Sequence, residues 1–214
     1  MTGMCGLNSC INGIKGWLNS MLCRGNILIF HRVLTHQATI DDSPSQNGFD
    51  AKIRLLSKIA MFHQNLPGFL DGPKATLYKR SLAVTFDDGY ADNFDVALPI
   101  LQRHGISATF FIASGYLNGG YMFNDGIIEA ISNTKKQVLD LSSRGYSSYT
   151  LESTDQKKRC FADLIGQIKY LNPDKRTDTV KRILDVADVP EPTHLMMTDE
   201  QVTQMHKAGM EIGG

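Results

Sequence analysis

Residues 81–90 read Ser81-Leu-Ala-Val-Thr-Phe-Asp-Asp-Gly-Tyr90, and this stretch decides the fold. Its first six residues are mostly apolar and β-favouring, so they predict a buried strand that runs into the polar turn Asp87–Tyr90. The segment Ala91–His104 predicts a helix, and Ile106–Ala113 predicts a second buried strand. A strand, a helix and a strand of these lengths form a βαβ unit, which predicts an α/β fold with a parallel sheet.

Two further segments extend this pattern toward the N-terminus. The apolar run Asn26–Val33 predicts another buried strand. Residues Phe49–Gln64 carry apolar side chains at spacings of three and four, which predicts an amphipathic helix. Pro99 interrupts the helix expected after the acidic turn, so that helix is expected to bend.

The C-terminal half changes character. Helical patterns of mixed charge occupy about 126–132, 153–171 and 173–186, which predicts a helical insertion over about 118–197. Thr198-Asp-Glu-Gln201 is typical of a capping box and predicts a helix start. Met210-Glu-Ile-Gly-Gly214 predicts another strand. We expect a loosely structured segment over 1–25 and one domain over 26–214.

Composition excludes several classes of function. The 214 residues are 42% hydrophobic, and 22 Lys and Arg balance 22 Asp and Glu. Zero net charge argues against nucleic-acid binding through bulk charge. We find no apolar run of 18 residues and no basic segment ahead of an apolar one in residues 1–25. These observations predict a cytoplasmic protein without a membrane span. Cys5, Cys10 and Cys23 lack zinc-site spacing and are expected to be free thiols.

Asp87 and Asp88 form the main candidate site. They lie where a predicted parallel strand ends, and ligands of α/β folds bind outside the carboxyl ends of the strands. Two adjacent carboxylates repel each other and favour a cation beside them. Gly89 permits a tight turn and close approach of a substrate. The residues alone leave a second interpretation open, since Asp-Gly pairs are also common in surface turns.

The run Leu82–Phe94 resembles the polysaccharide deacetylases, the carbohydrate esterases with a NodB-homology domain. Their first motif, T-F-D-D-G, is matched by Thr85–Gly89, and Ala108-Thr-Phe-Phe111 matches the following strand. The resemblance is specific over about 81–117 and looser elsewhere. It implies a distorted (β/α) barrel and metal-dependent removal of N-acetyl groups from an N-acetylated polysaccharide or oligosaccharide.

The same resemblance implies roles for individual residues. Asp87 would be the general base, Asp88 a ligand of a divalent metal, with zinc the expected ion, and Gly89 and Tyr90 would contact substrate. In one branch of the family the catalytic acid is a strand histidine, which Phe30-His-Arg-Val33 matches at His31. A histidine at a strand end can equally be a hydrogen-bonded core residue, so both interpretations of His31 stay open.

The chain departs from the family pattern at its C-terminal end. The second family motif, H-[ST]-x-x-H, completes the metal site and follows a strand such as Gly209–Gly214, where this sequence stops. Catalytic zinc has three protein ligands, so an incomplete site predicts weak metal binding and little or no activity of these 214 residues. The interpretation is that the sequence is the N-terminal part of a deacetylase.

The sequence offers two alternatives to an active deacetylase. The first is a truncated, non-catalytic deacetylase-like domain that binds glycan or a partner. The second is a phosphatase of the haloacid dehalogenase type, which requires D-x-D-G-T. Phe86 stands where that motif has its nucleophile, and Tyr90 follows the glycine, so the phosphatase is rejected.

Overall fold

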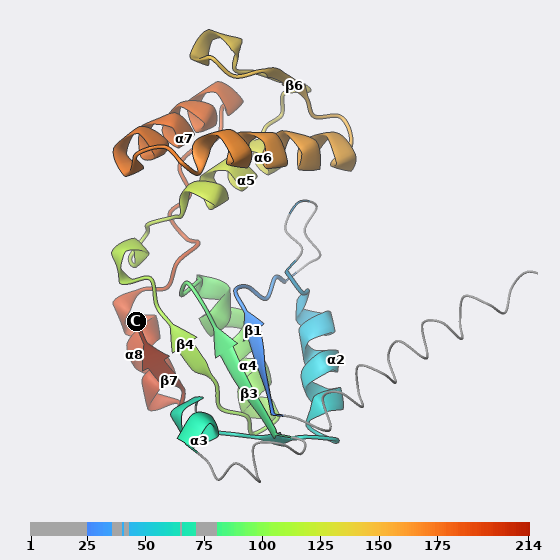
Figure 1. The fold of residues 1–214 in the computed structure, drawn as a ribbon, viewed down its shortest axis with the longest axis vertical. Helices are drawn as coiled ribbons and strands as arrows, with labels where there is room; N and C mark the ends of the chain where they lie inside the picture. Colours follow the sequence, from blue (N-terminus) through green and yellow to red (C-terminus); the bar gives the residue numbers. More distant parts are fainter. Residues whose placement is uncertain (1–24, 36–39, 41–42, 65, 72–80) are drawn as a thin grey trace, which may run out of the picture.

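The computed structural model describes residues 25–35, 40, 43–64, 66–71 and 81–214, and it has two lobes (Figure 1). The sheet lobe carries the acidic pair, and the helical lobe lies above it in the view of Figure 1. The strands of the sheet lobe are β1 (Asn26–Phe30), β2 (Met61–Phe62), β3 (Ser81–Phe86), β4 (Thr109–Phe111) and β7 (Glu211–Gly213). The segment 1–25, expected to be loosely structured, lies outside the described residues except for Gly25.

The strands of the sheet lobe are all parallel, in the order β1-β3-β4-β7, with β2 pairing the start of β3. Phe30 pairs with Phe86, Phe86 with Phe110, and Phe110 with Ile212. The carboxyl ends of the strands therefore meet at one edge, as the predicted α/β fold requires. The βαβ prediction around the acidic turn is confirmed. Among the described residues these five strands form one sheet.

Aromatic rings fill the centre of the sheet lobe. The rings of Phe86 and Phe110 stack with centroids 4.7 Å apart, and Phe30 stacks on Phe86 at 5.4 Å. Phe49 meets the Phe30 ring edge-on at 5.1 Å, which brings α2 (Gln46–Leu56) onto the sheet. Burying these rings removes a large apolar area from water, which stabilises the lobe on which the site is built.

Two predicted helices differ from the observed ones. The helix expected over 49–64 starts earlier and stops at Leu56, where Ser57 caps it and β2 follows. The helix expected over 91–104 is a π-helix, η1 (Asn93–Ala97), that continues as α4 (Leu98–Arg103). Pro99 sits in the first turn of α4, because proline lacks the amide that an interior position would donate.

The helical lobe has a hydrophobic core of its own. Its helices are α5 (Phe123–Asn133), α6 (Thr154–Ile168) and α7 (Pro173–Ala187), and they bury Leu164, Ile183 and other apolar residues between them. The structure adds an antiparallel hairpin of β5 (Val138–Asp140) and β6 (Ser148–Thr150), which the sequence analysis did not predict.

The chain returns to the sheet lobe through α8 (Asp199–Lys207). Thr198 accepts from the Gln201 amide and Gln201 reaches back to the Thr198 amide, so the predicted capping box is confirmed. The remaining short helices are α3 (Leu66–Asp71), η2 (Ser114–Tyr116) and η3 (Ser142–Arg144). In the described part of the chain, no helix has the length and apolar character needed to cross a bilayer.

Candidate active site

The turn after β3 is held on three sides by backbone hydrogen bonds. The Asp87 amide donates to the Phe30 carbonyl at 2.9 Å, and the Ala113 amide donates to the Asp88 carbonyl at 3.1 Å. The Met197 amide donates to the Gly89 carbonyl at 3.0 Å. The turn is therefore fixed against β1, the end of β4 and the segment that leads into α8.

This turn contains two consecutive left-handed residues. Asp88 has a φ of 76° and Gly89 a φ of 85°. Glycine adopts this conformation without strain, whereas a non-glycine residue there costs about 1–3 kcal/mol that its surroundings must offset. The strained geometry turns the Asp88 side chain away from the β3 direction and toward the end of β1.

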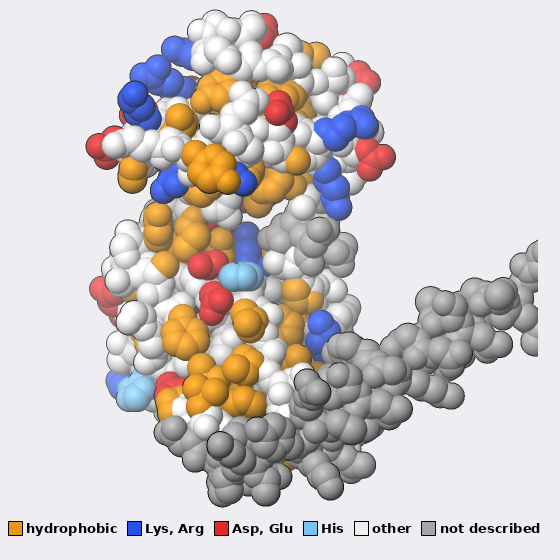
Figure 2. Space-filling model, in the orientation of Figure 1, with side chains coloured by type: hydrophobic (Ala, Val, Ile, Leu, Met, Phe, Trp, Pro, Cys, Tyr) orange, Lys and Arg blue, Asp and Glu red, His pale blue; other side chains and the backbone are white. Residues whose placement is uncertain are grey.

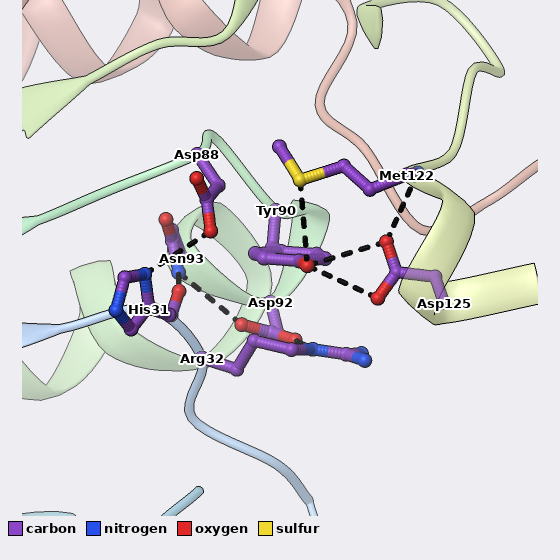
Figure 3. Close-up of polar contacts among 8 residues, drawn as sticks. All are labelled: His31, Arg32, Asp88, Tyr90, Asp92, Asn93, Met122 and Asp125. Carbon is purple, nitrogen blue, oxygen red and sulfur yellow. Dashed lines mark hydrogen bonds and ion pairs between the residues drawn. The ribbon is translucent and has the colours of Figure 1, made fainter. Parts of the chain in front are cut away.

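His31 and Asp88 are brought together by this geometry. His31 Nδ1 lies 3.1 Å from Asp88 Oδ2, although the two residues are 57 apart in sequence (Figure 3). The His31 side chain is 59% exposed and that of Asp88 30%, so the pair faces solvent. The core-histidine interpretation of His31 is therefore wrong, because a core residue would be buried.

Arg32 and Asp92 hold the end of β1 in place. Arg32 Nε donates to Asp92 Oδ2 at 2.8 Å, and the Val33 amide donates to Asp92 Oδ1 at 3.0 Å. Asn93 Nδ2 donates to the His31 carbonyl at 2.9 Å. The His31 backbone is thus fixed by groups at the start of η1, which follows the acidic turn.

Tyr90 and Asp125 join the two lobes. The Tyr90 hydroxyl donates to Asp125 Oδ1 at 3.0 Å, and the Arg32 guanidinium lies 4.7 Å from the centre of the Tyr90 ring. The Asp125 carboxylate also accepts from the Met122 amide at 3.1 Å. Figure 3 shows these contacts converging beside Asp88.

Burial shifts the ionisation of both partners in this link. Asp125 is 2% exposed, and burial raises the pKa of its carboxyl to about 6, although bonds from the Met122 amide and Tyr90 oppose the shift. Burial and the adjacent Asp125 charge raise the pKa of the Tyr90 hydroxyl above its ordinary value. Tyr90 therefore remains a neutral hydrogen-bond donor over the working range of pH.

A pocket of about 390 Å³ opens in front of these residues. His31, Arg32 and Asp88 line it from the sheet lobe, and Asn124 and Phe161 line it from the helical lobe. The pocket thus combines acidic, basic and aromatic groups at the carboxyl ends of the strands. That is where α/β folds bind ligands.

Asp87 is not among the residues that line this pocket, but it directly precedes Asp88, which does. No hydrogen bond or ion pair of its carboxylate is found within the described residues. Gly89 is buried beneath the turn, and a side chain there would meet Ile112 at 3.2 Å. Among the predicted site residues, the structure groups His31, Asp88 and Tyr90 around one pocket and leaves Asp87 and Gly89 in the adjoining turn.

The predicted metal site can be tested against these side chains. Among the described residues, no group of three or more His, Cys, Asp or Glu side chains could hold a metal ion. His31 and Asp88 bring only two donor residues together, whereas catalytic zinc has three protein ligands. The described residues therefore do not fit a complete zinc site. Cys5, Cys10 and Cys23 lie outside the described residues.

Arg32, Asp92, Asn93 and Asp125 were missed by the sequence analysis. Arg32, Asp92 and Asn93 lie within three residues of a predicted site residue, His31 or Tyr90, so proximity in sequence was the available signal. Asp125 lies 35 residues after Tyr90, at the N-terminal turn of α5, where an acidic residue is ordinary capping chemistry. Its role becomes visible only when the two lobes are brought together.

The fold is an α/β fold with a parallel sheet, and the candidate site is built on an acidic turn at the carboxyl ends of its strands. A family model described as "Polysaccharide deacetylase" matches residues 74–214, and the chain belongs to this family. The family is a group of metal-dependent hydrolases.

A curated relative, the poly-beta-1,6-N-acetyl-D-glucosamine N-deacetylase of Staphylococcus aureus strain MRSA252, is 26% identical over 177 residues. That alignment covers 80% of this chain and 60% of the relative, so the chain spans about three fifths of the relative's length. Among solved structures, a de-N-acetylase from Aggregatibacter actinomycetemcomitans matches 88% of this chain and 53% of its own, with 16% identity and a TM-score of 0.45. IcaB from Ammonifex degensii matches 87% of this chain and 97% of its own, with 17% identity and a TM-score of 0.39.

Proposed function

We propose that this protein removes N-acetyl groups from an N-acetylated sugar polymer, by hydrolysis of the amide bond. The observation that carries the proposal is the contact between His31 and Asp88 inside an open pocket, beside a complete Thr85–Gly89 motif. The S. aureus relative is named for poly-β-1,6-N-acetyl-D-glucosamine, and we propose the same class of substrate here. We further propose that the domain spans 26–214, with about 118–197 as its insertion.

The proposed reaction assigns two proton transfers. Asp87 accepts a proton from the attacking water, whose oxygen forms a bond to the acetyl carbonyl carbon. The C–N bond then breaks, and His31 gives a proton to the departing amine nitrogen, so the products are acetate and a free amine. The carboxylate of Asp87 suits a base because no described residue hydrogen-bonds to it.

The contact with Asp88 supports His31 as the acid. When Nδ1 donates to Asp88 Oδ2, the ring is oriented and Nε2 is left to carry the proton that the acid transfers. The Asn93 bond to the His31 carbonyl holds the backbone that carries this ring. We propose Asp88 as one ligand of the divalent metal on which the family depends, with zinc as the expected ion.

The acid role can be tested with two kinds of substrate. His31→Gln should slow acetate release from an N-acetylglucosamine oligomer by about 10²-fold or more, because the amine leaves poorly without a proton. Hydrolysis of 4-nitrophenyl acetate should fall much less, since nitrophenolate leaves without protonation. His206→Gln, in exposed α8, is the control. Equal losses on the amide and the ester would contradict the acid role.

A non-catalytic glycan-binding protein is the second candidate function. The observation that favours it is that the described residues lack a group of three metal-ligating side chains. In that case the pocket between the lobes would bind sugar without turnover. Binding of an oligosaccharide with no acetate release in the presence of added zinc would distinguish this function from the first.

A further inference from the structure

Resting on the proposed function, we propose that the helical lobe forms one wall of the sugar-binding pocket. In this proposal Asn124 and Phe161 contact the sugar unit next to the one that carries the reacting acetyl group. The lobe would then determine which polymer is bound, while the sheet lobe carries the chemistry.

The first support is the position of the pocket between the lobes. His31 and Asp88 lie on its sheet side, and Asn124, Ile128 and Phe161 lie on its helical side. Figure 2 shows a hollow between the two lobes, where a histidine and acidic side chains are exposed. A polymer that places an acetyl group at Asp88 therefore has the helical lobe within reach of its neighbouring sugar.

The second support is the chemistry of this wall. Sugar rings present apolar C–H faces and a rim of hydroxyl groups, and they bind where an apolar surface adjoins a few polar groups. Phe161 and Ile128 are half-buried on the core of the helical lobe and expose their remaining surface to the pocket. The Asn124 side chain has no hydrogen-bond partner among the described residues, so its amide is available to sugar hydroxyls.

The third support is that a hydrogen bond fixes the position of this wall relative to His31 and Asp88. Asp125 follows Asn124 directly, and its buried carboxylate accepts from Tyr90, two residues after Asp88. This bond fixes the first turn of α5 relative to the acidic turn. A fixed wall lowers the entropy cost of ordering a bound sugar, which is what a specificity-determining contact requires.

The test measures binding of a β-1,6-linked N-acetylglucosamine pentamer to the full chain by isothermal titration calorimetry. The variants are Asn124→Ala and Phe161→Leu, the latter keeping apolar volume so that the lobe stays folded. The controls are Asn133→Ala, at the far end of α5, and Tyr170→Leu, an aromatic residue that is 83% exposed outside the pocket. Circular dichroism and thermal unfolding confirm that each variant is folded.

We expect each pocket variant to weaken pentamer binding about tenfold and each control to bind within twofold of the unsubstituted protein. Unchanged binding in folded Asn124→Ala and Phe161→Leu would overturn the proposal, as would equal losses in the controls. An unsubstituted protein that fails to bind the pentamer would overturn it too. Acetate release by the unsubstituted protein is measured in parallel. If that protein binds the pentamer but releases no acetate, and only the pocket variants lose binding, the proposed function is refuted and the role of this wall is supported.

Discussion

The Tyr90 hydroxyl lies 3.0 Å from Oδ1 and 3.2 Å from Oδ2 of Asp125, so one buried donor serves both oxygens of a buried carboxylate. Tyr90 belongs to the acidic turn of the sheet lobe, and Asp125 belongs to the first turn of α5. The Arg32 guanidinium lies over the same tyrosine ring and bonds to Asp92. The contact between the lobes and the support of the β1 end are therefore parts of one network.

Removing the Tyr90 hydroxyl should destabilise this link. In Tyr90→Phe the Asp125 carboxylate keeps the Met122 amide but loses its side-chain donor, and an under-satisfied buried charge costs about 1–3 kcal/mol. Urea denaturation should show that loss in the free energy of unfolding. Tyr116→Phe, at a residue that is 36% exposed, is the matched control and should change little. Equal stability of the two variants would show that the bond contributes nothing.

Asp125 should also make stability depend on pH. Below about pH 4 the group is protonated in both folded and unfolded chains. Between pH 4 and 6 the folded state, with a pKa of about 6, keeps a proton that the unfolded chain loses, so stability falls as pH rises. Above pH 6 the resulting loss in the free energy of unfolding is constant, on the order of 3 kcal/mol.

The comparison of Asp125→Asn with the unsubstituted protein isolates this effect from all other carboxyl groups. The free energy of unfolding is measured by urea denaturation at pH 4, 5, 6 and 7. Relative to Asp125→Asn, the unsubstituted protein should lose stability between pH 4 and 6 and then level off. A difference that is flat across this range, or that changes in the opposite direction, is incompatible with a raised pKa at Asp125.

Gly89 should tolerate no side chain. Gly89→Ala places a Cβ 3.2 Å from the Ile112 side chain at a φ of 85°, so both overpacking and backbone strain oppose it. Gly145→Ala is the control, because Gly145 has a φ of 82° but open space around it. We expect thermal unfolding to show a loss of about 1 kcal/mol in the control and about 1–3 kcal/mol more in Gly89→Ala. Equal losses would mean that the contact with Ile112 is unimportant.

Zinc should bind this chain weakly. The site has two donor residues, whereas a catalytic zinc site has three protein ligands. We therefore expect a binding free energy much smaller than the roughly 10–16 kcal/mol of structural zinc sites. Chelator competition measures this in a variant with Cys5, Cys10 and Cys23 replaced by Ser, which removes the thiols outside the described residues. Asp88→Asn should abolish the weak binding that remains. One tight site per chain in the Cys-to-Ser variant would contradict the expectation.

Local pattern predicted the elements that carry the site. Ser81–Phe86 is buried along its whole length and is observed with the predicted bounds, because a continuous apolar run permits few other structures. The capping box at Thr198 could also be predicted from the sequence, because its hydrogen bonds join residues that are three apart in the chain. The β5–β6 hairpin was missed because each strand has three residues, too few for a period of two to stand out.

The relationships within the site depend on tertiary structure and were less accessible. The contact between His31 and Asp88 spans 57 residues, and that between Tyr90 and Asp125 spans 35. The first depends on the parallel pairing of β1 with β3, which the sequence analysis did not predict. The second depends on how the helical lobe packs on the sheet lobe, which no local pattern specifies. The roles of Asp87, Asp88 and His31 remain predictions.

Acetate release from a β-1,6-linked N-acetylglucosamine pentamer, measured with added zinc, tests the central claim most directly. The unsubstituted protein should release acetate slowly, because its metal site is incomplete in the described residues, and Asp87→Asn should reduce that rate at least 10²-fold through loss of the base. Asp95→Asn, at an exposed residue of η1, should leave the rate unchanged. A rate in Asp87→Asn equal to that of the unsubstituted protein, or no release above buffer in either, would contradict deacetylation at this site.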